Sequence, residues 1–321
     1  MRIDMRETAN LLKQNNNILF LCHKHPDGDT LGSASALAHA LIAMGKTVRI
    51  ECNDPIPKDF DFMFEGIENS AFEPEFIVAV DIADTKLLGT ELEAKYGKCI
   101  NLCIDHHSSN ILYAEKVFLD GASASTAEMV YLLLGELGAD ITPLIASCLF
   151  TGVSTDTGCF RFSNTTVRTF EIASKLAALG ADTYNIIQVF FETKTKTYAA
   201  LERLALDSMR FYFSDRCALI CVTQDMYEKS GSDESETDRL ANLPRQVEGV
   251  LVGITMRELK DGSFKASVRT HGDIDASEIC KRLGGGGHKG ASGCTLYGTK
   301  QQAINALLKE VEAEIDVFRI D

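Results

Sequence analysis

Three short apolar runs in the first third of the chain constrain its fold more than any other feature. They are ILFLC at 18–22, FIVAV at 76–80 and INLCI at 100–104. Short runs that are aliphatic or β-branched without alternation are typical of strands buried on both faces of a parallel sheet. Stretches with helical periodicity separate the runs, and this alternation predicts crossover connections and an α/β fold.

Acidic and imidazole side chains follow these runs and one later helical stretch. The carboxyl ends of parallel strands converge on the crevice where open α/β sheets bind ligands. Taken singly, an aspartate after an apolar run is more often a helix cap or a turn residue. Together, such groups would repel and desolvate one another unless cations compensated them, so the pattern favours two divalent metals. The residues are His23, Asp27, Asp29, Asp81, Asp105, His106, His107 and Asp156.

These residues resemble, in order and spacing, the motifs of the DHH phosphoesterase superfamily. His23, Asp27 and Asp29 are similar to the first motif, and Asp81 to the second. Asp105-His106-His107 is similar to the third motif, which names the superfamily, and Asp156 to the fourth. GGGGHKGASG at 284–293 resembles the nucleotide-binding motif of the DHH-associated domain. Within the superfamily, the chain resembles the stand-alone bacterial group that degrades nanoRNA and dephosphorylates 3′-phosphoadenosine 5′-phosphate (pAp).

The resemblance implies how the metal ligands divide. Asp81 would bridge two Mn²⁺ ions, for which Mg²⁺ or Co²⁺ are alternatives, and oxygen-rich ligation with imidazole suits such ions. His23 and Asp27 would complete one site. The other site would take Asp29, His106 and Asp156. His107 would face the scissile phosphate, and Asp105 would orient His106.

The resemblance also implies a substrate-binding element near the C-terminus. A glycine run alone is more typical of a flexible loop. Here it follows a predicted helix, DIDASEICKRL, and precedes a predicted strand, CTLYG, so both of its ends would be held. Glycines allow the backbone to approach a phosphate or base closely. The residues expected to hold the nucleotide remote from the cut are Ser267, Arg269, Gly285, Gly286, Gly287 and His288.

The distribution of patterns predicts two domains joined by a helical linker. The alternation of strand and helix ends near residue 185, which places an N-terminal parallel-sheet domain with flanking helices at 1–185. A polar helical connector follows at 186–207. A smaller α/β domain at 208–321 contains two predicted strand pairs, MRFYFSDRCALICVT and VEGVLVGITMREL with SFKASVRTH.

The segment FRFSNTTVRT at 160–169 directly follows Asp156. We expect Asn164 and Thr165 to cap the helix that begins near Thr166. Arg168 is a weaker candidate for a phosphate contact.

The net charge and the composition limit the kinds of substrate that this chain is expected to bind. A formal charge of −14 disfavours long nucleic acid, which normally requires a basic surface. A short anionic substrate is compatible with this charge, because bound metals and a few nearby lysines and arginines can supply positive potential at its phosphates. Most of the ten cysteines lie in apolar patterns and are expected to be reduced core residues. No leader or membrane span is recognisable, so a cytoplasmic protein is expected; the oligomeric state stays open, a homodimer included.

The function predicted on these grounds is a two-metal phosphoesterase that hydrolyses short oligoribonucleotides and pAp. A phosphodiesterase acting on cyclic di-AMP or the dinucleotide pApA is the alternative from the same chemistry. A broad single-strand exonuclease and a manganese pyrophosphatase fit less well, because the chain is acidic and lacks the Ser-Arg-Lys motif of the latter. A catalytically inactive nucleotide-binding sensor is the alternative from another class, and the complete set of clustered carboxylates speaks against it.

Overall fold

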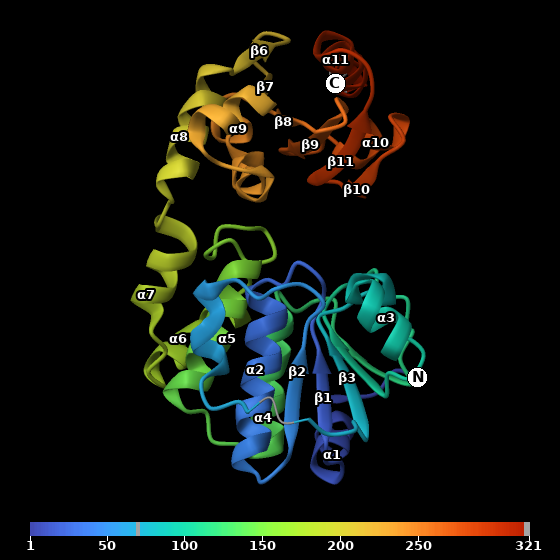
Figure 1. Cartoon of the computed structure of the whole chain (residues 1–321), viewed down its shortest axis with the longest axis vertical. Coiled ribbons are helices and arrows are strands. Elements are labelled where there is room, and N and C mark those ends of the chain that lie inside the picture. Colours follow the sequence, from blue (N-terminus) through green and yellow to red (C-terminus); the bar gives the residue numbers. More distant parts are fainter. Residues whose placement is uncertain (69–70, 318–321) are drawn as a thin grey trace. The chain divides into compact units, whose positions relative to one another are not determined.

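The structure is a computed structural model that describes residues 1–68 and 71–317 (Figure 1). The chain divides into two compact units, Met1–Thr193 and Lys194–Asp321. The division falls inside 186–207, the segment expected to be a linker. Helix α7 (Thr183–Ile187) and the π-helical turn η3 (Gln188–Glu192) belong to the first unit, whereas helix α8 (Lys196–Asp207) begins the second.

The first unit contains the predicted parallel sheet, in the strand order β2-β1-β3-β4-β5. The three apolar runs form β1, β3 and β4, as predicted. Strand β5 was not among the apolar runs, and it pairs with β4 at one edge. The strands are β1 (Ile18–Leu21), β2 (Val48–Glu51), β3 (Phe76–Val80), β4 (Leu102–Asp105) and β5 (Lys116–Leu119).

Helices cover both faces of this sheet, which explains why the central strands are apolar throughout. Phe20 and Val78 pack in one core cluster with helices on one face, whereas Leu21 and Ala79 pack in another with α3. The helices are α1 (Met5–Gln14), α2 (Gly28–Ala43), α3 (Thr90–Tyr96), α4 (Thr126–Leu137), α5 (Pro143–Asp156) and α6 (Val167–Ala178). Two short 3₁₀ helices are η1 (Lys58–Phe64) and η2 (Thr85–Leu88).

Helices α2 and α5 approach each other closely because glycines lie at their contact. A Cβ atom at Gly32 would lie 2.3 Å from the carbonyl oxygen of Cys148 in α5, and one at Gly152 would lie 3.3 Å from the Cα of Asp29 in α2. Side chains would therefore separate the helices. This packing matters for the site, since Asp29 lies in α2 and Asp156 is the last residue of α5.

The second unit is built on a mostly antiparallel sheet, in the order β10-β11-β9-β8-β7-β6. Both predicted strand pairs are confirmed, β6 with β7 and β8 with β9, whereas β7 and β8 pair in parallel. Part of the glycine run forms the edge strand β10. The strands are β6 (Arg210–Tyr212), β7 (Cys217–Val222), β8 (Val252–Glu258), β9 (Phe264–Thr270), β10 (Gly286–His288) and β11 (Ala291–Leu296).

Helices α10 and α11 pack on one face of this second sheet. Ile279 of α10 and Leu307 of α11 share a core with Ile254 and Val268 of β8 and β9. The other face carries 3₁₀ segments, since Thr255 of β8 donates a hydrogen bond to the carbonyl of Leu240. The helices are α9 (Gln224–Ser230), η4 (Glu234–Asn242), η5 (Pro244–Gln246), α10 (Ala276–Arg282) and α11 (Lys300–Val317).

Within the described ranges, no helix combines the length and the apolar character needed to cross a bilayer. The ten cysteines are free thiols, and most of them are buried.

The contact between α2 and α5 gives a stability prediction. Gly32→Ala should lower the melting temperature of the first unit, with a cost of about 1–3 kcal/mol, because the new methyl group meets backbone. Gly135→Ala in α4 is the matched control: no atom lies within 4 Å of its Cβ position. This control should be neutral or stabilise by about 0.4–1 kcal/mol through the unfolded chain. Differential scanning calorimetry of the whole chain measures both, and equal melting temperatures would contradict the packing argument.

Candidate metal centre

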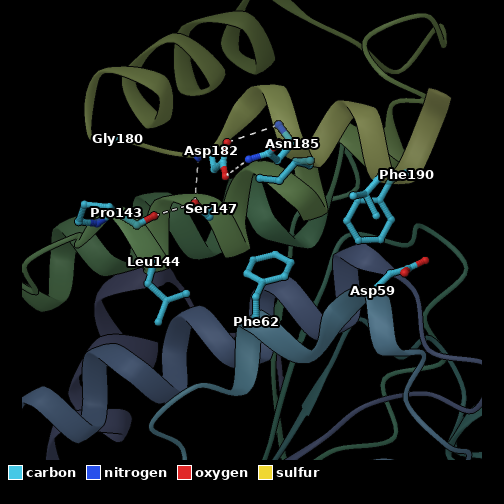
Figure 2. A pocket seen from close by; sticks show the side chains of 11 residues that line it. Asp59, Phe62, Pro143, Leu144, Ser147, Gly180, Asp182, Asn185 and Phe190 are labelled. Atoms are coloured by element: carbon cyan, nitrogen blue, oxygen red, sulfur yellow. Dashed lines mark hydrogen bonds between the residues drawn. The ribbon is translucent and has the colours of Figure 1, made fainter. Parts of the chain in front are cut away.

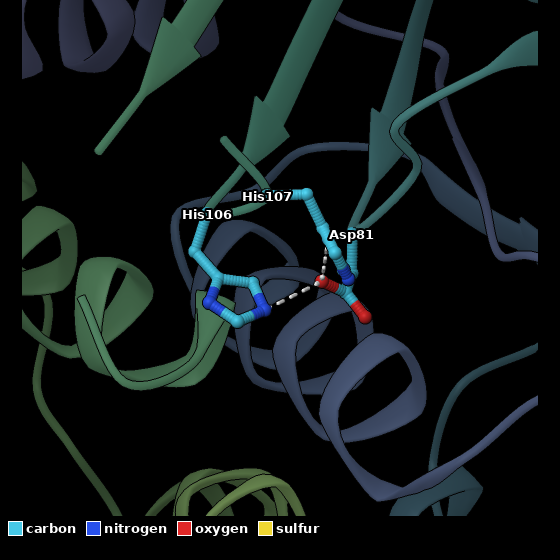
Figure 3. A group of neighbouring side chains, drawn as sticks. All are labelled: Asp81, His106 and His107. Atoms are coloured by element: carbon cyan, nitrogen blue, oxygen red, sulfur yellow. Dashed lines mark ion pairs between the residues drawn. The ribbon is translucent and has the colours of Figure 1, made fainter. Parts of the chain in front are cut away.

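The six predicted metal ligands lie together at the carboxyl ends of β1, β3 and β4. Their ligand atoms form overlapping groups, and within each group these atoms lie within 4.8 Å of one another. Asp81 and His106 each belong to two groups, and His107 joins one of them (Figure 3). The groups are Asp81–His106–His107, His23–Asp27–Asp81 and Asp29–His106–Asp156.

The end of β1 and the start of α2 supply His23 and Asp27. The Nδ1 atom of His23 lies 2.8 Å from the carbonyl oxygen of Lys24, which leaves Nε2 to face the cluster. Nε2 lies 3.5 Å from Oδ1 of Asp27 and 3.7 Å from Oδ2 of Asp81. Asp27 is also the N-cap of α2, since its Oδ1 accepts hydrogen bonds from the backbone of Asp29 and Thr30.

Asp81 lies at the centre of the cluster. It follows β3 with a φ of 62°, a left-handed conformation that aspartate and asparagine tolerate better than most residues. Only 3% of the residue is exposed. Its Oδ1 accepts a 2.8 Å hydrogen bond from the hydroxyl of Thr126, the first residue of α4. The carboxylate is therefore held from one side, while its other oxygen faces His23.

Asp29 is fully buried and bound to the amino-terminal end of α4. Its carboxylate accepts hydrogen bonds from the backbone N–H groups of Thr126, at 2.7 Å, and Ala127, at 2.8 Å. These N–H groups would otherwise lack a partner, because the first turn of a helix has no intrahelical acceptor for them. The positive end of the α4 dipole also favours a carboxylate here.

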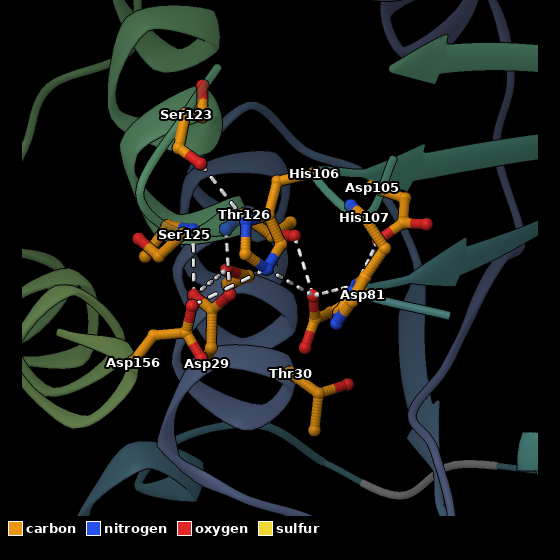
Figure 4. A network of polar contacts seen from close by, with 12 residues as sticks. Asp29, Thr30, Asp81, Asp105, His106, His107, Ser123, Ser125, Thr126 and Asp156 are labelled. Carbon is orange, nitrogen blue, oxygen red and sulfur yellow. Dashed lines mark hydrogen bonds and ion pairs between the residues drawn. The ribbon is translucent and has the colours of Figure 1, made fainter. Parts of the chain in front are cut away.

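His106 presents a buried nitrogen that has no hydrogen-bond partner. Its Nδ1 lies 3.1 Å from the carbonyl oxygen of Ser123, which directs Nε2 inward (Figure 4). Nε2 is buried without a hydrogen bond and lies 3.4 Å from Oδ2 of Asp156 and 3.7 Å from Oδ1 of Asp81. A buried imidazole nitrogen aimed at carboxylates is suited to a cation, so these residues fit a metal ion.

Burial and mutual repulsion make the carboxylates costly to ionise. Burial raises the pKa of Asp29 well above its ordinary value, and the charges of Asp81 and Asp156 raise it further. Burial and the charge of Asp27 raise the pKa of Asp81. The pKa of Asp156 rises to about 7, again chiefly through burial. Bound cations would remove this cost.

Asp105 and His107 form a pair of their own, which corrects one expectation. Asp105 was expected to orient His106, but its Oδ1 lies 2.7 Å from Nδ1 of His107. The turn after β4 also brings the backbone N–H of His107 to the same oxygen, at 3.2 Å, and Asn110 donates to the other oxygen at 2.6 Å. The hydrogen bond with Asp105 raises the pKa of His107 to about 9. His106 is oriented by Ser123 instead.

A pocket elsewhere in the first unit is unsuited to a phosphate. The pocket has a volume of about 430 Å³, and its walls include Phe62 and Phe190 (Figure 2). Among the described residues that line it, none is a lysine or arginine, and Asp59 and Asp182 add negative charge. The hydroxyl of Ser147 accepts a hydrogen bond from the backbone N–H of Asp182 and donates one to the carbonyl oxygen of Pro143, so it is already bonded within the protein.

The residues expected to hold the nucleotide lie close together in the second unit. Ser267 and Arg269 are two residues apart on β9 and therefore face the same side of the sheet. Gly293 of β11 lies between Ser267 and Gly286, and Ala291 lies between Arg269 and His288. The small residues of β11 thus leave space between Ser267 and Arg269 on one side and Gly286 and His288 on the other. Gly285 and Gly287 approach the backbone of β11 too closely for a side chain, and Gly287 has a φ of 150°. Their role in binding stays a prediction.

Comparison with known proteins places the chain. The family model "DHH family, N-terminal domain" matches residues 17–153, and "DHHA1 domain" matches residues 218–316. The bifunctional oligoribonuclease and PAP phosphatase NrnA of Thermus thermophilus is 33% identical over 321 residues, which cover 97% of this chain and 94% of that protein. The chain belongs to the DHH family.

Other relatives agree with this placement. The cyclic-di-AMP phosphodiesterase GdpP of Geobacillus thermodenitrificans is 26% identical over 312 residues, which cover 89% of this chain but 46% of that protein. The crystal structure of an exopolyphosphatase-related protein from Bacteroides fragilis matches with a TM-score of 0.89 at 23% identity, over 98% of this chain and 97% of that one. The second similarity supports the fold alone. The expected DHH domain and DHH-associated domain are confirmed.

Sequence reasoning missed the residues that support the DHH-family cluster from α4 and α6. Arg168 was considered for a phosphate contact, but its guanidinium donates to Ser123 Oγ at 2.8 Å and to Glu128 Oε2 at 3.2 Å. It also pairs with Asp120 at 3.4 Å. Thr166 with Thr169, rather than Asn164 and Thr165, caps α6. Asn164 instead donates to the carbonyl oxygens of Ala124 and Asp156. The capping-box spacing of two threonines was the available signal.

Removal of metal should destabilise the first unit. Mn²⁺ should raise its melting temperature, because cations offset the repulsion among buried carboxylates; at a hundredfold excess over Kd the gain is about 2.7 kcal/mol. Asp81→Asn should abolish most of this shift, yet raise the melting temperature of the metal-free protein, since the pKa of Asp81 is raised by burial. Asp59→Asn, outside the cluster, is the control. A full Mn²⁺ shift in Asp81→Asn would contradict the assignment of Asp81.

Arg168 should act on the centre through Ser123. Arg168→Lys keeps the charge beside Glu128 but loses the forked donor that reaches Ser123, whose carbonyl orients His106. We expect Mn²⁺ affinity to fall about 10-fold in isothermal titration calorimetry, the lower end for residues that orient a ligand. The control is Arg203→Lys, whose partner Asp207 is exposed. Unchanged Mn²⁺ affinity together with a lowered melting temperature would assign Arg168 to stability alone.

Proposed function

We propose that this chain is a Mn²⁺-dependent two-metal phosphoesterase that hydrolyses short oligoribonucleotides and removes the 3′-phosphate of pAp. The observation that carries the proposal is the convergence of four carboxylates and two imidazoles, with the buried Nε2 of His106 left without a hydrogen bond. The oligoribonuclease and PAP phosphatase that is similar over nearly the whole chain supports the choice of substrates.

The residues divide into two ligand sets that share Asp81. His23 and Asp27 would hold one ion, and Asp29, His106 and Asp156 would hold the other. Such a pair of ions supplies a hydroxide at neutral pH and stabilises charge on the transferring phosphoryl group. Mn²⁺ suits this mixture of carboxylate and imidazole, whereas Mg²⁺ or Co²⁺ are the alternatives.

His107 is the protein group free to act on the phosphate. Because Nδ1 is bound to Asp105, Nε2 remains for substrate, and 41% of the side chain is exposed. From this position, Nε2 can donate a hydrogen bond to a phosphoryl oxygen or to the departing oxygen. Asp105 holds the ring and its protonated form, in the way that a buried carboxylate orients a catalytic histidine.

The second unit would hold the rest of the substrate. Ser267, Arg269, His288 and the glycines Gly285 to Gly287 would bind the nucleotide remote from the cut. The formal charge of −14 supports short substrates, because long nucleic acid would need a wider basic surface. A cytoplasmic location, where such substrates arise from RNA turnover, is part of this proposal.

Cyclic di-AMP phosphodiesterase activity is less well supported. The GdpP relative is less similar and about twice as long as the segment it shares with this chain. An inactive nucleotide-binding sensor would have no use for buried carboxylates whose pKa values are raised, since those groups cost stability.

One side-by-side assay tests the proposal. With Mn²⁺, the chain should hydrolyse pAp, pApA and a five-residue RNA, and turnover should fall steeply for a 24-residue RNA. Asp81→Asn should lower kcat by more than about 1000-fold, because it weakens both metal sites. Faster turnover of cyclic di-AMP than of the linear substrates would favour the alternative. Failure to hydrolyse any of them would leave the binding-only function.

A further inference from the structure

A pocket in the second unit adjoins the residues expected to hold the nucleotide and shares Gly285 with them, whereas its other lining residues have no assigned role. Its volume is about 440 Å³. Lys265, Thr295 and Tyr297 form its wall, and Gly284 and Gly285 lie at its other side. No atom lies within 4 Å of the Cβ position of Gly284, which is in a left-handed conformation at φ 78°, so this part of the pocket is open.

The pocket continues the face on which Ser267 and Arg269 lie. Residues 265, 267 and 269 alternate along β9, so their side chains share one face of the sheet. In the register of the sheet, Thr295 is opposite Lys265, as Gly293 is opposite Ser267. Four residues of strand separate Lys265 from Arg269, which corresponds to about 13 Å. The two cations are therefore too far apart to hold one phosphate.

The charges at this end of the face are arranged for an anion. Lys265 of β9 is directly opposite Arg257 of β8. Like charges in this position destabilise a sheet pair, so an anion bound at Lys265 would relieve the repulsion. Arg257 donates to the carbonyl oxygen of Glu234, but no acidic side chain in the described part of the chain pairs with Lys265. Lys265 is exposed and available to a phosphate.

Tyr297 adds an aromatic surface to the same pocket. It follows β11, and 78% of the residue is exposed, the largest value among the exposed large hydrophobic residues. Its ring contacts no other aromatic ring or cation among the residues that the structure describes. An exposed ring next to a lysine is the combination that sequence-tolerant binders of single strands use, with a base stacked on the ring and the backbone phosphate on the cation.

We propose that this pocket is an additional nucleotide subsite, in which Lys265 binds a phosphate and Tyr297 stacks on a base of an oligonucleotide longer than two residues. The inference rests on the proposed function, since the pocket would hold a further nucleotide of the same oligoribonucleotide substrate. The subsite favours three- to five-residue chains over dinucleotides, and it holds any base because stacking does not read hydrogen-bonding edges.

The test compares substrates of different length in Lys265→Gln and Tyr297→Ala. Each variant should raise the KM for a five-residue RNA relative to the KM for pApA by about fivefold or more, the effect of losing one stacked base or one phosphate contact. Lys309→Gln on α11 and Tyr184→Ala on α7 change exposed residues of the same types outside the pocket, and they should leave the ratio unchanged. An unchanged ratio in both pocket variants would overturn the subsite.

Binding without turnover separates this inference from the proposed function. In an Asp81→Asn background, the Kd of a fluorescent five-residue RNA is measured by anisotropy at several salt concentrations. Adding Lys265→Gln should lower the slope of log Kd against log salt by about 0.7, the value for one single-strand phosphate contact. The same slope with and without Lys265 would overturn the phosphate contact. Absence of hydrolysis in the parent chain with this slope change intact would reject the enzyme and retain the subsite.

Discussion

The repulsion among Asp29, Asp81 and Asp156 is the constraint on which the rest of the first unit depends. Three carboxylates share one buried region, and burial raises the pKa of each of them. A fold that keeps such groups needs partners for them. The α4 amino terminus serves Asp29, the Thr126 hydroxyl serves Asp81, and the unsatisfied Nε2 of His106 faces Asp156. These contacts do not neutralise the negative charge of the three carboxylates, and divalent cations can do so.

The packing of the helices follows from the same constraint. Asp29 can reach the backbone of α4 only because α2 lies close to α4 and α5, and Gly32 and Gly152 permit that approach. A Cβ at Gly152 would lie 2.9 Å from Oδ1 of Asp29, so a larger residue there would press directly on the ligand. Stability and chemistry are therefore coupled at this contact, because the helix spacing sets the ligand position.

The sequence predicted the strands and the acids that follow them because both depend on local pattern. Apolar runs define β1, β3 and β4, and the carboxyl ends of parallel strands must share one edge. The pairing of Asp105 with His107 depended on the turn that follows β4, where the backbone N–H and the ring of His107 meet the same oxygen. Adjacent residues in sequence do not reveal this. The contacts of Arg168 with Asp120 and Ser123 span more than forty residues, and no periodicity encodes them.

The edge strand β10 shows why a glycine run need not be a flexible loop. Gly286 and Gly287 pair with Gly293 and Ser292 of β11, so the ladder fixes their backbone. A sheet edge normally presents N–H and C=O groups that attract other strands, and here the strand is only three residues long, which limits that risk. Without side chains, the same edge lets a ligand approach the backbone itself. The predicted site, formed by backbone groups with Ser267, Arg269 and His288, would bind a nucleotide with little regard to its base, as the proposed RNA substrates require.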